Sequence, residues 1–396
     1  MKIVYICDFF HPEAGYHPNL LSKYWTKFGH EVIILTSELD KMPVSLTHFF
    51  NCTDIIEKDQ VFEKQNRVKI IRLPIYCFIS GRSIYKPMIL KVIKGIAPDV
   101  VYVNGNDTFI GILLTCLYKW GKYGLVLDSH MLDIASNNRF KSLFRWFYKT
   151  FIAKIIIKNK IPVIRAQNDG YIEKFLGIPL KDSPWISFGA DMLLFHPDEK
   201  AKPTLRMTKG IKPKSFVILY AGKISKVKGM DLFSEAIRLK FHSEKDVCII
   251  VIGATEGEEG KIIEESLAKS ENNVIRFPTQ KHIDLPQFYQ LADLAVFPKQ
   301  CSLSFFDVQA CGLPVVFEDN NINLERGRAG NAKTFESNNA DQLRDTIESF
   351  INMPSEEFIK YKQNSIDYVT QNYNYEKKAE EYLPYLEKQK NNKRTS

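Results

Sequence analysis

The segment 302–316, SLSFFDVQACGLPVV, contains residues whose types and spacing fit a binding site. Ser304 is followed three residues later by Asp307, the spacing of a capping box, which predicts that a helix begins here. The first turn of a helix has unpaired N–H groups and a partial positive charge, so it favours a bound anion. Asp307, one turn into the helix, is placed to accept hydrogen bonds from a sugar. This layout suits a nucleotide-sugar pocket, although an ordinary capped surface helix has the same spacing.

A second group of candidate residues lies in 222–229, GKISKVKG, where three lysines stand between two glycines. A helical stretch is expected from about Asp231. Cationic side chains on such a loop favour an anionic ligand. The loop lacks the GxxxxGK[ST] spacing of a P-loop, which disfavours Walker-type hydrolysis of a nucleoside triphosphate. A solvated run of charge is the alternative interpretation.

The first half of the chain offers candidates after two predicted strands. Gly15 lies in the loop after the first strand, where a glycine lets the backbone approach a phosphate or sugar closely. His130 follows the strand 124–128, so it can face a cleft and bond a sugar hydroxyl. A plain turn glycine and a structural histidine are the alternatives. His17 and Asp133 are expected as further contacts to the sugar or the acceptor.

Short apolar strands alternate with helical stretches twice along the chain, which predicts how these residues are positioned. The first half has strands at 2–7, 31–36, 69–73, 99–103, 124–128 and 161–166, and the second half at 215–221, 247–252, 273–277, 293–297 and 314–317. Apolar strands separated by helices indicate parallel sheets with helices on both faces. The expected fold class is α/β, with two doubly wound domains that face a cleft and bind ligands beyond the carboxyl ends of their strands.

Length and composition agree with a two-domain globular protein. The chain has 396 residues, more than one core usually fills, with 45% hydrophobic and 25% charged residues. The seam is expected in the Lys- and Pro-rich stretch 197–213. No stretch reaches the roughly 18 consecutive apolar residues of a membrane span, and the N-terminus lacks a signal-peptide layout. Seven scattered cysteines without a CxxC pair predict reduced thiols in a cytosolic protein.

Positive charge gathers in the first half of the chain. Residues 1–200 hold 26 Lys and Arg against 19 Asp and Glu, and the remainder holds 28 against 27, which accounts for the net charge of +8. The segment 139–160, RFKSLFRWFYKTFIAKIIIKNK, has seven basic residues, no acidic residue and interleaved aromatic rings. A basic aromatic helix can lie at an anionic membrane surface, and the alternative is a helix whose apolar face is in the core. Nucleic-acid binding is not expected, because no recognised module accompanies the charge.

Several longer segments together resemble the retaining glycosyltransferases of family 4, the glycosyl transferases group 1, which have the GT-B fold. The resemblance covers most of the chain and includes these segments: HPEAGYHPNLLSKYWTKFGHEVIILTS (11–37), WISFGADMLLFHP (185–197), AGKISKVKGMDLFSEAI (221–237), NVIRFPTQKHIDLPQFYQLADLAVFP (273–298) and YNYEKKAEEYL (373–383). It implies an acceptor-binding domain at 1–196, a donor-binding domain at 197–369, and a C-terminal helix within about 370–396 that packs back on the first domain.

The resemblance also implies roles for individual residues. Lys228 matches a lysine that contacts the donor diphosphate, and Lys223 stands where the family usually has arginine, which keeps the charge but loses the bidentate fork. Asp307 stands where a glutamate normally bonds the ribose. His130 matches the histidine beside the transferred sugar. The other expected contacts to the donor, sugar or acceptor are Gly15, Lys299, Ser304, Phe305 and Glu325.

One departure from the family concerns the transferred sugar. The usual pair of glutamates eight residues apart would place the first at Lys299, which is a cation here. Backbone amides around Leu303 to Phe305 can still hold a hydroxylated sugar. No DxD sequence occurs in the chain, so neither a metal nor a cofactor is expected. Lys223, Lys228 and the helix near Ser304 would stabilise the departing diphosphate, and the leaving phosphate could deprotonate the acceptor.

The expected function is a metal-independent retaining transfer of a sugar from a nucleotide sugar to a glycan or lipid-linked acceptor. Surface polysaccharide or lipopolysaccharide assembly is the expected setting. The expected location is the cytoplasm, with peripheral contact at the inner face of the plasma membrane through 139–160. A GT-B sugar-nucleotide epimerase and a non-catalytic nucleotide- or glycan-binding scaffold are the alternatives, the latter because Lys299 replaces an acidic residue.

Overall fold

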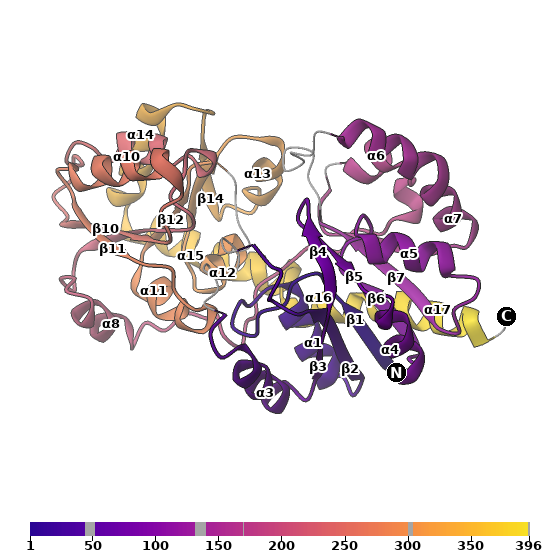
Figure 1. Ribbon diagram of the computed structural model, residues 1–396. Helices are drawn as coiled ribbons and strands as arrows, with labels where there is room; N and C mark the ends of the chain where they lie inside the picture. Colours follow the sequence, from indigo (N-terminus) through magenta and orange to yellow (C-terminus); the bar gives the residue numbers. More distant parts are fainter. Residues whose placement is uncertain (44–51, 131–139, 169, 300–303, 395–396) are drawn as a thin grey trace. The chain divides into compact units, whose positions relative to one another are not determined.

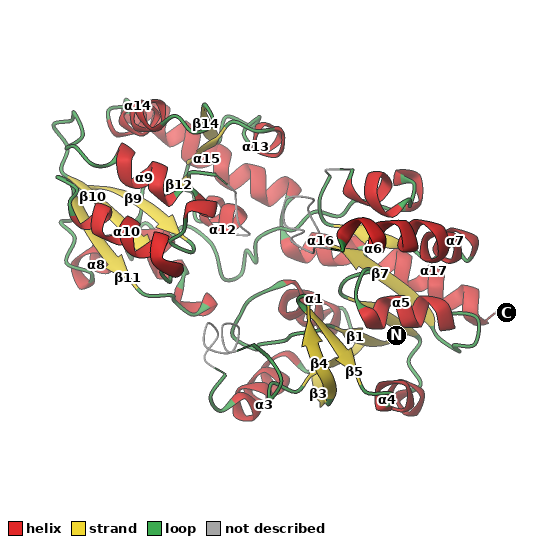
Figure 2. Ribbon diagram, turned by 45° about the horizontal axis from the view of Figure 1, so that its top comes forward, coloured by secondary structure: helices red, strands yellow, loops and turns green. Residues whose placement is uncertain are grey.

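The structure is a computed structural model that describes residues 1–43, 52–130, 140–168, 170–299 and 304–394 (Figure 1). Contacts divide the chain into two compact units: unit 1 joins Met1–Phe188 to Glu376–Ser396, and unit 2 is Gly189–Tyr375. Both units are α/β, as the sequence predicts (Figure 2). The first boundary falls at 188/189 and the second at 375/376, against the predicted positions of 196/197 and about 370.

Unit 1 is built on a six-stranded parallel sheet with the order β3-β2-β1-β6-β7-β8. All six strands predicted in the first half of the chain are present. They are β1 (Lys2–Ile6), β2 (Glu31–Ser37), β3 (Lys69–Leu73), β6 (Val100–Val103), β7 (Gly124–Ser129) and β8 (Val163–Arg165). The antiparallel hairpin of β4 (Ile75–Ile79) and β5 (Arg82–Tyr85) was not predicted.

Strand β1 shows why these strands are apolar along their whole length. Val4 and Ile6 belong to the main core of the unit, together with residues of the flanking helices. Tyr5 points to the other face, because successive side chains of a strand alternate, and its ring lies 6.1 Å from Trp25 and 5.0 Å from Tyr102. Both faces of the sheet are therefore buried, as expected for a doubly wound fold.

The helices of unit 1 follow the strands in the predicted alternation. They are α1 (His17–Lys27), α3 (Ile55–Asn66), α4 (Met88–Ile96), α5 (Phe109–Leu117), α6 (Lys141–Phe147) and α7 (Ala153–Lys158), with α6 and α7 joined by a π-helical turn (Tyr148–Ile152). Helix α5 shows how such an element begins: the Thr108 hydroxyl accepts a hydrogen bond from the Gly111 backbone N–H at 3.0 Å. This is an N-cap, and it satisfies one of the donors left open at a helix start.

The C-terminal end of the chain completes unit 1, as the sequence predicts. Helices α16 (Tyr375–Glu381) and α17 (Leu383–Arg394) return to it, and α17 packs on β7. The Trp25 indole donates a hydrogen bond to the Ala379 carbonyl at 3.0 Å. A Cβ added at Gly124 would lie 2.7 Å from the Gln389 carbonyl carbon, so only glycine allows this approach of helix and strand.

Unit 2 repeats the architecture on a second six-stranded parallel sheet, with the order β11-β10-β9-β12-β13-β14. Its strands are β9 (Phe216–Ala221), β10 (Val247–Ile252), β11 (Asn273–Phe277), β12 (Leu294–Phe297), β13 (Val315–Glu318) and β14 (Ala332–Phe335). The first five were predicted and β14 was not. Its helices are α8 (Lys202–Thr208), α9 (Met230–Ala236), α10 (Gly257–Ala268), α11 (Pro286–Leu291), α12 (Ser304–Ala310), α13 (Asn321–Arg326), α14 (Ala340–Ile351) and α15 (Ser355–Asn372).

The seam expected over 197–213 lies inside unit 2 and carries helix α8. The Arg206 guanidinium is buried and lies 2.6 Å from Asp293, and the Lys202 ammonium lies 2.7 Å from the same carboxylate. Asp293 precedes β12, so these two cations fix α8 to the edge of the sheet where the strands begin. The lysines and prolines of this stretch therefore serve a packed helix and not a linker.

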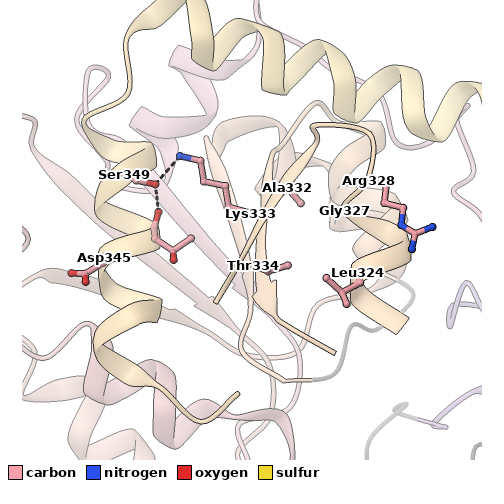
Figure 3. Close-up of a pocket in the computed structure, with 9 residues that line it drawn as sticks. Leu324, Gly327, Arg328, Ala332, Lys333, Thr334, Asp345 and Ser349 are labelled. Carbon is pink, nitrogen blue, oxygen red and sulfur yellow. Dashed lines mark hydrogen bonds between the residues drawn. The ribbon is translucent and has the colours of Figure 1, made fainter. Parts of the chain in front are cut away.

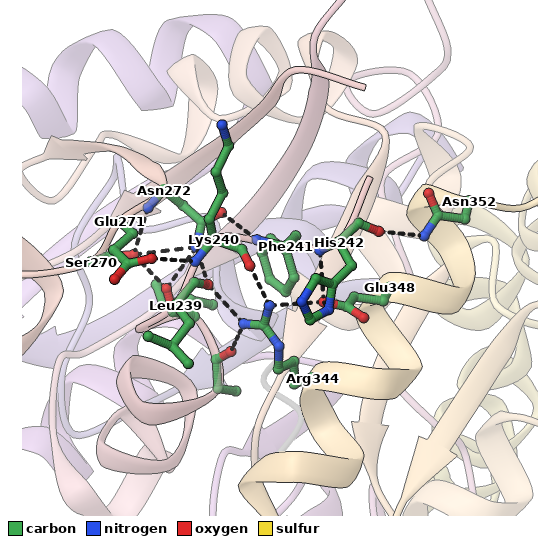
Figure 4. A network of polar contacts seen from close by, with 12 residues as sticks. Leu239, Lys240, Phe241, His242, Ser270, Glu271, Asn272, Arg344, Glu348 and Asn352 are labelled. Atoms are coloured by element: carbon green, nitrogen blue, oxygen red, sulfur yellow. Dashed lines mark hydrogen bonds and ion pairs between the residues drawn. The ribbon is translucent and has the colours of Figure 1, made fainter. Parts of the chain in front are cut away.

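A polar network fixes the chain between α9 and β10 at that same edge of the sheet (Figure 4). Arg344, on α14, donates hydrogen bonds to the carbonyls of Leu239 and Lys240, and lies 2.8 Å from Glu348. The Asn272 amide donates a hydrogen bond to the Leu239 carbonyl at 2.9 Å. Because β10 starts here, the network holds the edge opposite to the one where ligands bind.

Candidate functional site

The donor residues predicted for unit 2 lie beside the point where its strand order reverses. Strand β9 neighbours both β10 and β12, so the chain builds the sheet outward in two directions from this pair. Ligands of open α/β sheets bind beyond the carboxyl ends of the strands at such a reversal. The loop after β9 is 222–229 and the loop after β12 begins at Pro298. Both predicted segments therefore leave the sheet at this point.

Lys223 and Lys228 occupy different positions on the loop after β9. The loop contains one turn of 3-10 helix, Lys226–Lys228, and ends at Gly229. The Lys223 ammonium lies 3.0 Å from the Glu256 carboxylate, and both side chains are exposed. Lys228 is partly buried. Lys228 is therefore the more firmly placed cation.

The two loops touch at Gly229. Its φ of 73° is a conformation that favours glycine. A Cβ added there would lie 2.9 Å from both Pro298 Cβ and Lys299 Cγ, closer than side chains normally pack. Lys299, which replaces the family's glutamate, therefore lies against the lysine loop. This arrangement brings Lys228 and Lys299 to the same end of the sheet.

Helix α12 begins at Ser304, where the spacing predicts a helix start, and residues 300–303, which precede it, lie outside the described residues. Phe305 is fully buried, and its ring lies 6.2 Å from Phe297 and 5.7 Å from Phe317. Its side chain belongs to the core, which leaves the backbone amide, the group expected from the sequence to hold a sugar. Phe305 can serve a ligand only through its backbone.

Asp307 lies one turn into α12 and is 8% exposed. Burial, and then the nearby Asp191 carboxylate, raise the pKa of Asp307 well above its usual range. Burial thus favours the protonated, neutral form of this carboxyl. A neutral carboxyl can both donate and accept a hydrogen bond, which still suits a pair of ribose hydroxyls.

Two predicted contacts fall outside what the structure describes. Asp133 lies in 131–139, beyond the described residues, and Glu325 lies on α13, where its side chain is not described. On the same helix, sequence analysis missed Asn323, which is buried and donates hydrogen bonds to the carbonyls of Glu318, at 2.7 Å, and Lys299, at 3.4 Å. Asn323 therefore fixes α13 to the loop after β12.

In unit 1 the strand order reverses between β1 and β6, and His130 follows the neighbouring strand β7. Its imidazole Nε2 lies 2.8 Å from Asp128 Oδ2, and 28% of its side chain is exposed. Asp128 is buried and also accepts hydrogen bonds from the Tyr102 hydroxyl and the Gly105 backbone N–H, each at 2.7 Å. The aspartate therefore orients His130 at the end of the sheet. Gly15, with φ of 65°, lies in the loop between β1 and α1.

His17 is buried beside His130 and is not an exposed sugar contact. The two rings lie 4.8 Å apart, and the His17 Nε2 is 3.7 Å from Asp128 Oδ2. Burial, and then the neighbouring His130, lower the pKa of His17 well below its usual range. The Tyr382 hydroxyl, from the returning C-terminal segment, is 3.5 Å from the His17 Nε2. His17 is therefore placed to position His130.

Sequence analysis missed Asp128, although one feature indicated it. Asp128 stands two residues before His130, near the end of the strand, so the two side chains leave on the same face. Tyr102 and Tyr382 had no such feature, because they meet His17 only after the sheet and the C-terminal helices have formed.

Asp8 is a second carboxyl that sequence analysis missed, in the loop directly after β1. Its backbone carbonyl accepts hydrogen bonds from the hydroxyls of Ser37, at 2.5 Å, and Ser83, at 3.1 Å. Both carboxylate oxygens are buried without a hydrogen-bond partner in the described part of the chain. Burial raises the pKa of Asp8 to about 7, against the lowering effect of Arg82 and of the Ser83 backbone, with Asp107 adding to the rise.

A cavity of about 650 Å³ lies away from these residues, between β14, α13 and α14 (Figure 3). Arg328, Lys333 and Asp345 line it, and the Lys333 ammonium donates a hydrogen bond to the Ser349 hydroxyl at 3.0 Å. None of the residues predicted to bind the donor lines this cavity. Its position beside an edge strand also differs from the point of strand reversal.

The basic aromatic segment, described from residue 140 to 160, has one face packed in the core and one exposed face, and so combines the two alternatives drawn from the sequence. Tyr148, Ile152 and Ile156 are buried in the core of unit 1. The opposite side forms the basic aromatic face, which we define by these exposed residues: Phe140, Lys141, Leu143, Trp146, Phe147, Phe151, Lys154 and Lys158. Trp146 is 59% exposed and Phe140 72%. The described helices include none long and apolar enough to cross a membrane.

Not every cation of this segment is available at that face. The Arg145 guanidinium lies 3.8 Å from the centre of the Phe175 ring, and the Lys149 ammonium donates a hydrogen bond to the Lys174 carbonyl at 2.7 Å. Both side chains therefore hold the segment to the rest of unit 1.

Comparison with known families and proteins agrees with this geometry. Residues 201–367 match the family described as glycosyl transferases group 1. A D-inositol 3-phosphate glycosyltransferase of Segniliparus rotundus is 31% identical over 136 residues, which cover 32% of this chain and 30% of that protein. The chain thus spans about a third of the length of this curated relative.

Solved structures match over nearly the whole chain. A glycosyltransferase from Rickettsia africae superposes with a TM-score of 0.74 at 14% identity, over 98% of both chains. Anabaena Alr3699/HepE, in complex with UDP and glucose, superposes with a TM-score of 0.71 at 18% identity. The superposition covers 98% of this chain and 100% of the Anabaena chain. At such identities the likeness shows the fold, which is the GT-B arrangement of two Rossmann-like domains.

Proposed function

We propose that this protein is a retaining glycosyltransferase, because its residues 201–367 match the family described as glycosyl transferases group 1. It transfers a sugar from a nucleotide-sugar donor to a glycan or lipid-linked acceptor. The observation that carries the proposal is the meeting of two loops at the strand reversal of unit 2, where Gly229 lies against Pro298 and Lys299. The lysines of the loop 222–229, which ends at this contact, favour an anionic donor such as a diphosphate sugar.

The donor is a nucleoside diphosphate sugar. In the transfer, the bond between the anomeric carbon and the diphosphate breaks, and negative charge develops on the leaving phosphate. Lys228 and Lys223, on the loop after β9, supply positive charge at the end of the sheet, which lowers the energy of that state. Asp307 bonds the ribose, and His130 contacts the transferred sugar. The Anabaena neighbour, which was solved with UDP and glucose, supports this donor class.

The acceptor hydroxyl attacks on the face that the diphosphate leaves, and the leaving phosphate accepts its proton. This route needs no metal ion and no organic cofactor, so we propose that catalysis is metal-independent. Turnover should then not fall after removal of metals with a chelator. A loss of turnover that added Mn²⁺ or Mg²⁺ restores would refute this part of the proposal.

The acceptor is a glycan or a lipid-linked intermediate of surface polysaccharide or lipopolysaccharide assembly, reached from the cytoplasmic side of the plasma membrane. The basic aromatic face supports this setting. Aromatic rings settle at the boundary between headgroups and acyl chains, and lysines attract anionic headgroups. The rings are exposed although the opposite side of the same segment is packed in the core. A surface of this composition fits an anionic lipid layer.

A panel of nucleotide sugars, offered with and without membrane lipid extract, tests the function. Nucleotide release that depends on the extract supports transfer. Release or altered sugar without any acceptor would indicate an epimerase, and binding without turnover a scaffold. Asp307→Ala should weaken nucleotide binding by about 1–3 kcal/mol, the scale of a lost hydrogen bond to a buried group. Unchanged affinity in the folded variant would refute the ribose contact.

Cosedimentation with anionic vesicles tests the membrane contact. The double variant Trp146→Ser, Phe151→Ser should bind the vesicles more weakly than the parent. Exchange of Lys154 and Lys158 for glutamate should also weaken binding, because each basic residue contributes about 1 kcal/mol to the free energy of binding. Trp120→Ser is the matched control, because Trp120 is 77% exposed in unit 1 but lies outside the basic aromatic face. If the face variants bind as the parent does, or if the control loses binding equally, this face does not contact the membrane.

A further inference from the structure

We propose that His17, Asp128 and His130 form a binding site for one divalent transition-metal ion, with Zn²⁺ the best match, and that a bound ion inhibits the protein. One ligand atom from each residue lies within 4.8 Å of the others. The Asp128 Oδ2 atom is 2.8 Å from the His130 Nε2 and 3.7 Å from the His17 Nε2. Ligand atoms around tetrahedral zinc stand about 3.3 Å apart. The separations of 2.8 Å and 3.7 Å lie on either side of this distance of about 3.3 Å.

Neighbouring groups hold the carboxylate as metal sites require. The Tyr102 hydroxyl donates a hydrogen bond to Asp128 Oδ2, and the Gly105 backbone N–H donates one to Asp128 Oδ1, each at 2.7 Å. Such partners fix the orientation of a metal-binding side chain and raise affinity. Asp128 can therefore serve the ion without moving its backbone.

The ligand atoms select the class of metal. Two imidazole nitrogens and one carboxylate oxygen suit Zn²⁺, Co²⁺ or Ni²⁺. Mg²⁺ and Ca²⁺ prefer six or more oxygen ligands, which this group does not offer. His17 and Asp128 are buried, whereas 28% of the His130 side chain is exposed. An ion therefore enters from the His130 side, where a water molecule completes its coordination.

Binding changes the role of His130. Without metal, its Nε2 faces Asp128 and shares a hydrogen with it. With metal, the Nε2 lone pair binds the ion, and the ring's hydrogen lies on Nδ1. Because His130 is the residue proposed to contact the transferred sugar, the ion blocks that contact. This inhibitory effect rests on the proposed function, but the binding itself does not.

Titration of the chelator-treated protein with CoCl₂ tests the site. Tetrahedral Co²⁺ has visible absorption, and we expect it to saturate at one equivalent and to disappear when Zn²⁺ is added. His130→Gln and Asp128→Asn should each weaken binding at least about tenfold, because each removes a ligand. His242→Gln and Cys116→Ser should bind as the parent does, since His242 is 88% exposed in its side chain, Cys116 is exposed, and neither belongs to the group.

The outcomes separate this inference from the proposed function. The proposed site is overturned if the parent shows no saturable Co²⁺ absorption. It is also overturned if a folded His130→Gln variant binds Co²⁺ as tightly as the parent does. If both ligand variants unfold, zinc-edge X-ray absorption of the zinc-loaded parent still identifies the ligands. We expect two imidazole ligands and no sulfur ligand. A sulfur ligand would overturn the assignment. If Co²⁺ binds as expected but no nucleotide sugar is turned over, the metal site stands and the proposed function fails. If transfer proceeds and Zn²⁺ binds without slowing it, the inhibition is wrong.

Discussion

Replacing Gly229 with alanine tests the contact on which the donor site depends. The added methyl group would lie 2.9 Å from Pro298 Cβ and from Lys299 Cγ, and 3.2 Å from the Pro298 carbonyl carbon. The lysine side chain can turn aside, but the proline ring and backbone cannot. The φ of 73° at Gly229 adds a second cost for any residue with a Cβ. We therefore expect the loop after β12 to be displaced from the lysine loop.

Gly210→Ala is a matched control in the same unit. Gly210 has nearly the same φ, 72°, but a Cβ there would have nothing within 4 Å. A left-handed backbone conformation costs a non-glycine residue about 1–2 kcal/mol. Overpacking adds about 1–3 kcal/mol. Gly229→Ala should therefore destabilise unit 2 by about 1–3 kcal/mol more than Gly210→Ala does.

Two measurements check this expectation. Thermal unfolding should place the transition of Gly229→Ala lower than that of Gly210→Ala, by about 2–4 °C for each kcal/mol in a unit of this size. Calorimetric titration with UDP should show weaker binding in Gly229→Ala and parental binding in Gly210→Ala. Equal losses of stability would mean that the two loops do not touch, and parental UDP affinity in the folded Gly229 variant would refute the donor site.

Four further expectations concern single residues. Lys228→Ala should lower turnover on the order of a hundredfold, and more than Lys223→Ala does. The reason is that Lys228 is partly buried at the end of the loop, whereas Lys223 already pairs with Glu256. Steady-state rates near those of the parent in the Lys228 variant would contradict this. His130→Ala should lower turnover and leave UDP affinity almost unchanged in calorimetry, and an equal loss of affinity would indicate structural damage. Lys299→Glu, which restores the family's carboxylate, should change which donors are used in the nucleotide-sugar panel, and an identical profile would show that this position does not contact the sugar. Asp8→Asn should change how the free energy of unfolding depends on pH. Burial raises the pKa of Asp8 from 3.8 to about 7, so between these pH values the folded state keeps a proton that the unfolded chain has lost. The free energy of unfolding of the parent therefore falls as the pH rises from 3.8 to about 7. The full effect is about 4 kcal/mol at most, and urea unfolding of the parent and the variant at about pH 5 and about pH 8 should show a smaller loss in the variant.

The sheets could be predicted from the sequence because their strands are buried on both faces. Runs such as 31–36 and 247–252 are apolar at nearly every position, which is typical of a central parallel strand. The strands that were missed lack this property. In β14 (Ala332–Phe335), an edge strand, only Phe335 is buried, and the hairpin of β4 and β5 carries exposed side chains such as Tyr76 and Ile79.

The candidate site could be predicted in part, by position along the chain and not by environment. Lys228 and Asp307 lie at the strand reversal where the motif spacing indicated them, and His130 was indicated by its place after a predicted strand and by the resemblance to the family. Their surroundings come from contacts between distant segments, such as Asp191 beside Asp307. The burial of the Phe305 ring could not be predicted for the same reason, since its position beside Ser304 gives no information about which way its ring points. Packing of the folded unit decides that.

The return of α17 to β7 has a consequence for the order in which the protein is made. Unit 2 is complete once residue 375 has emerged from the ribosome, but unit 1 still lacks its last segment at that moment. Until residues 376–394 have emerged as well, one face of the first sheet has no cover from Tyr382 and Leu386, both of which are buried in the folded protein. Unit 1 is thus begun before unit 2 and finished after it. A nascent chain stalled between these two stages would expose that apolar face to chaperones, and cleavage within 376–394 would damage the unit that contains β1.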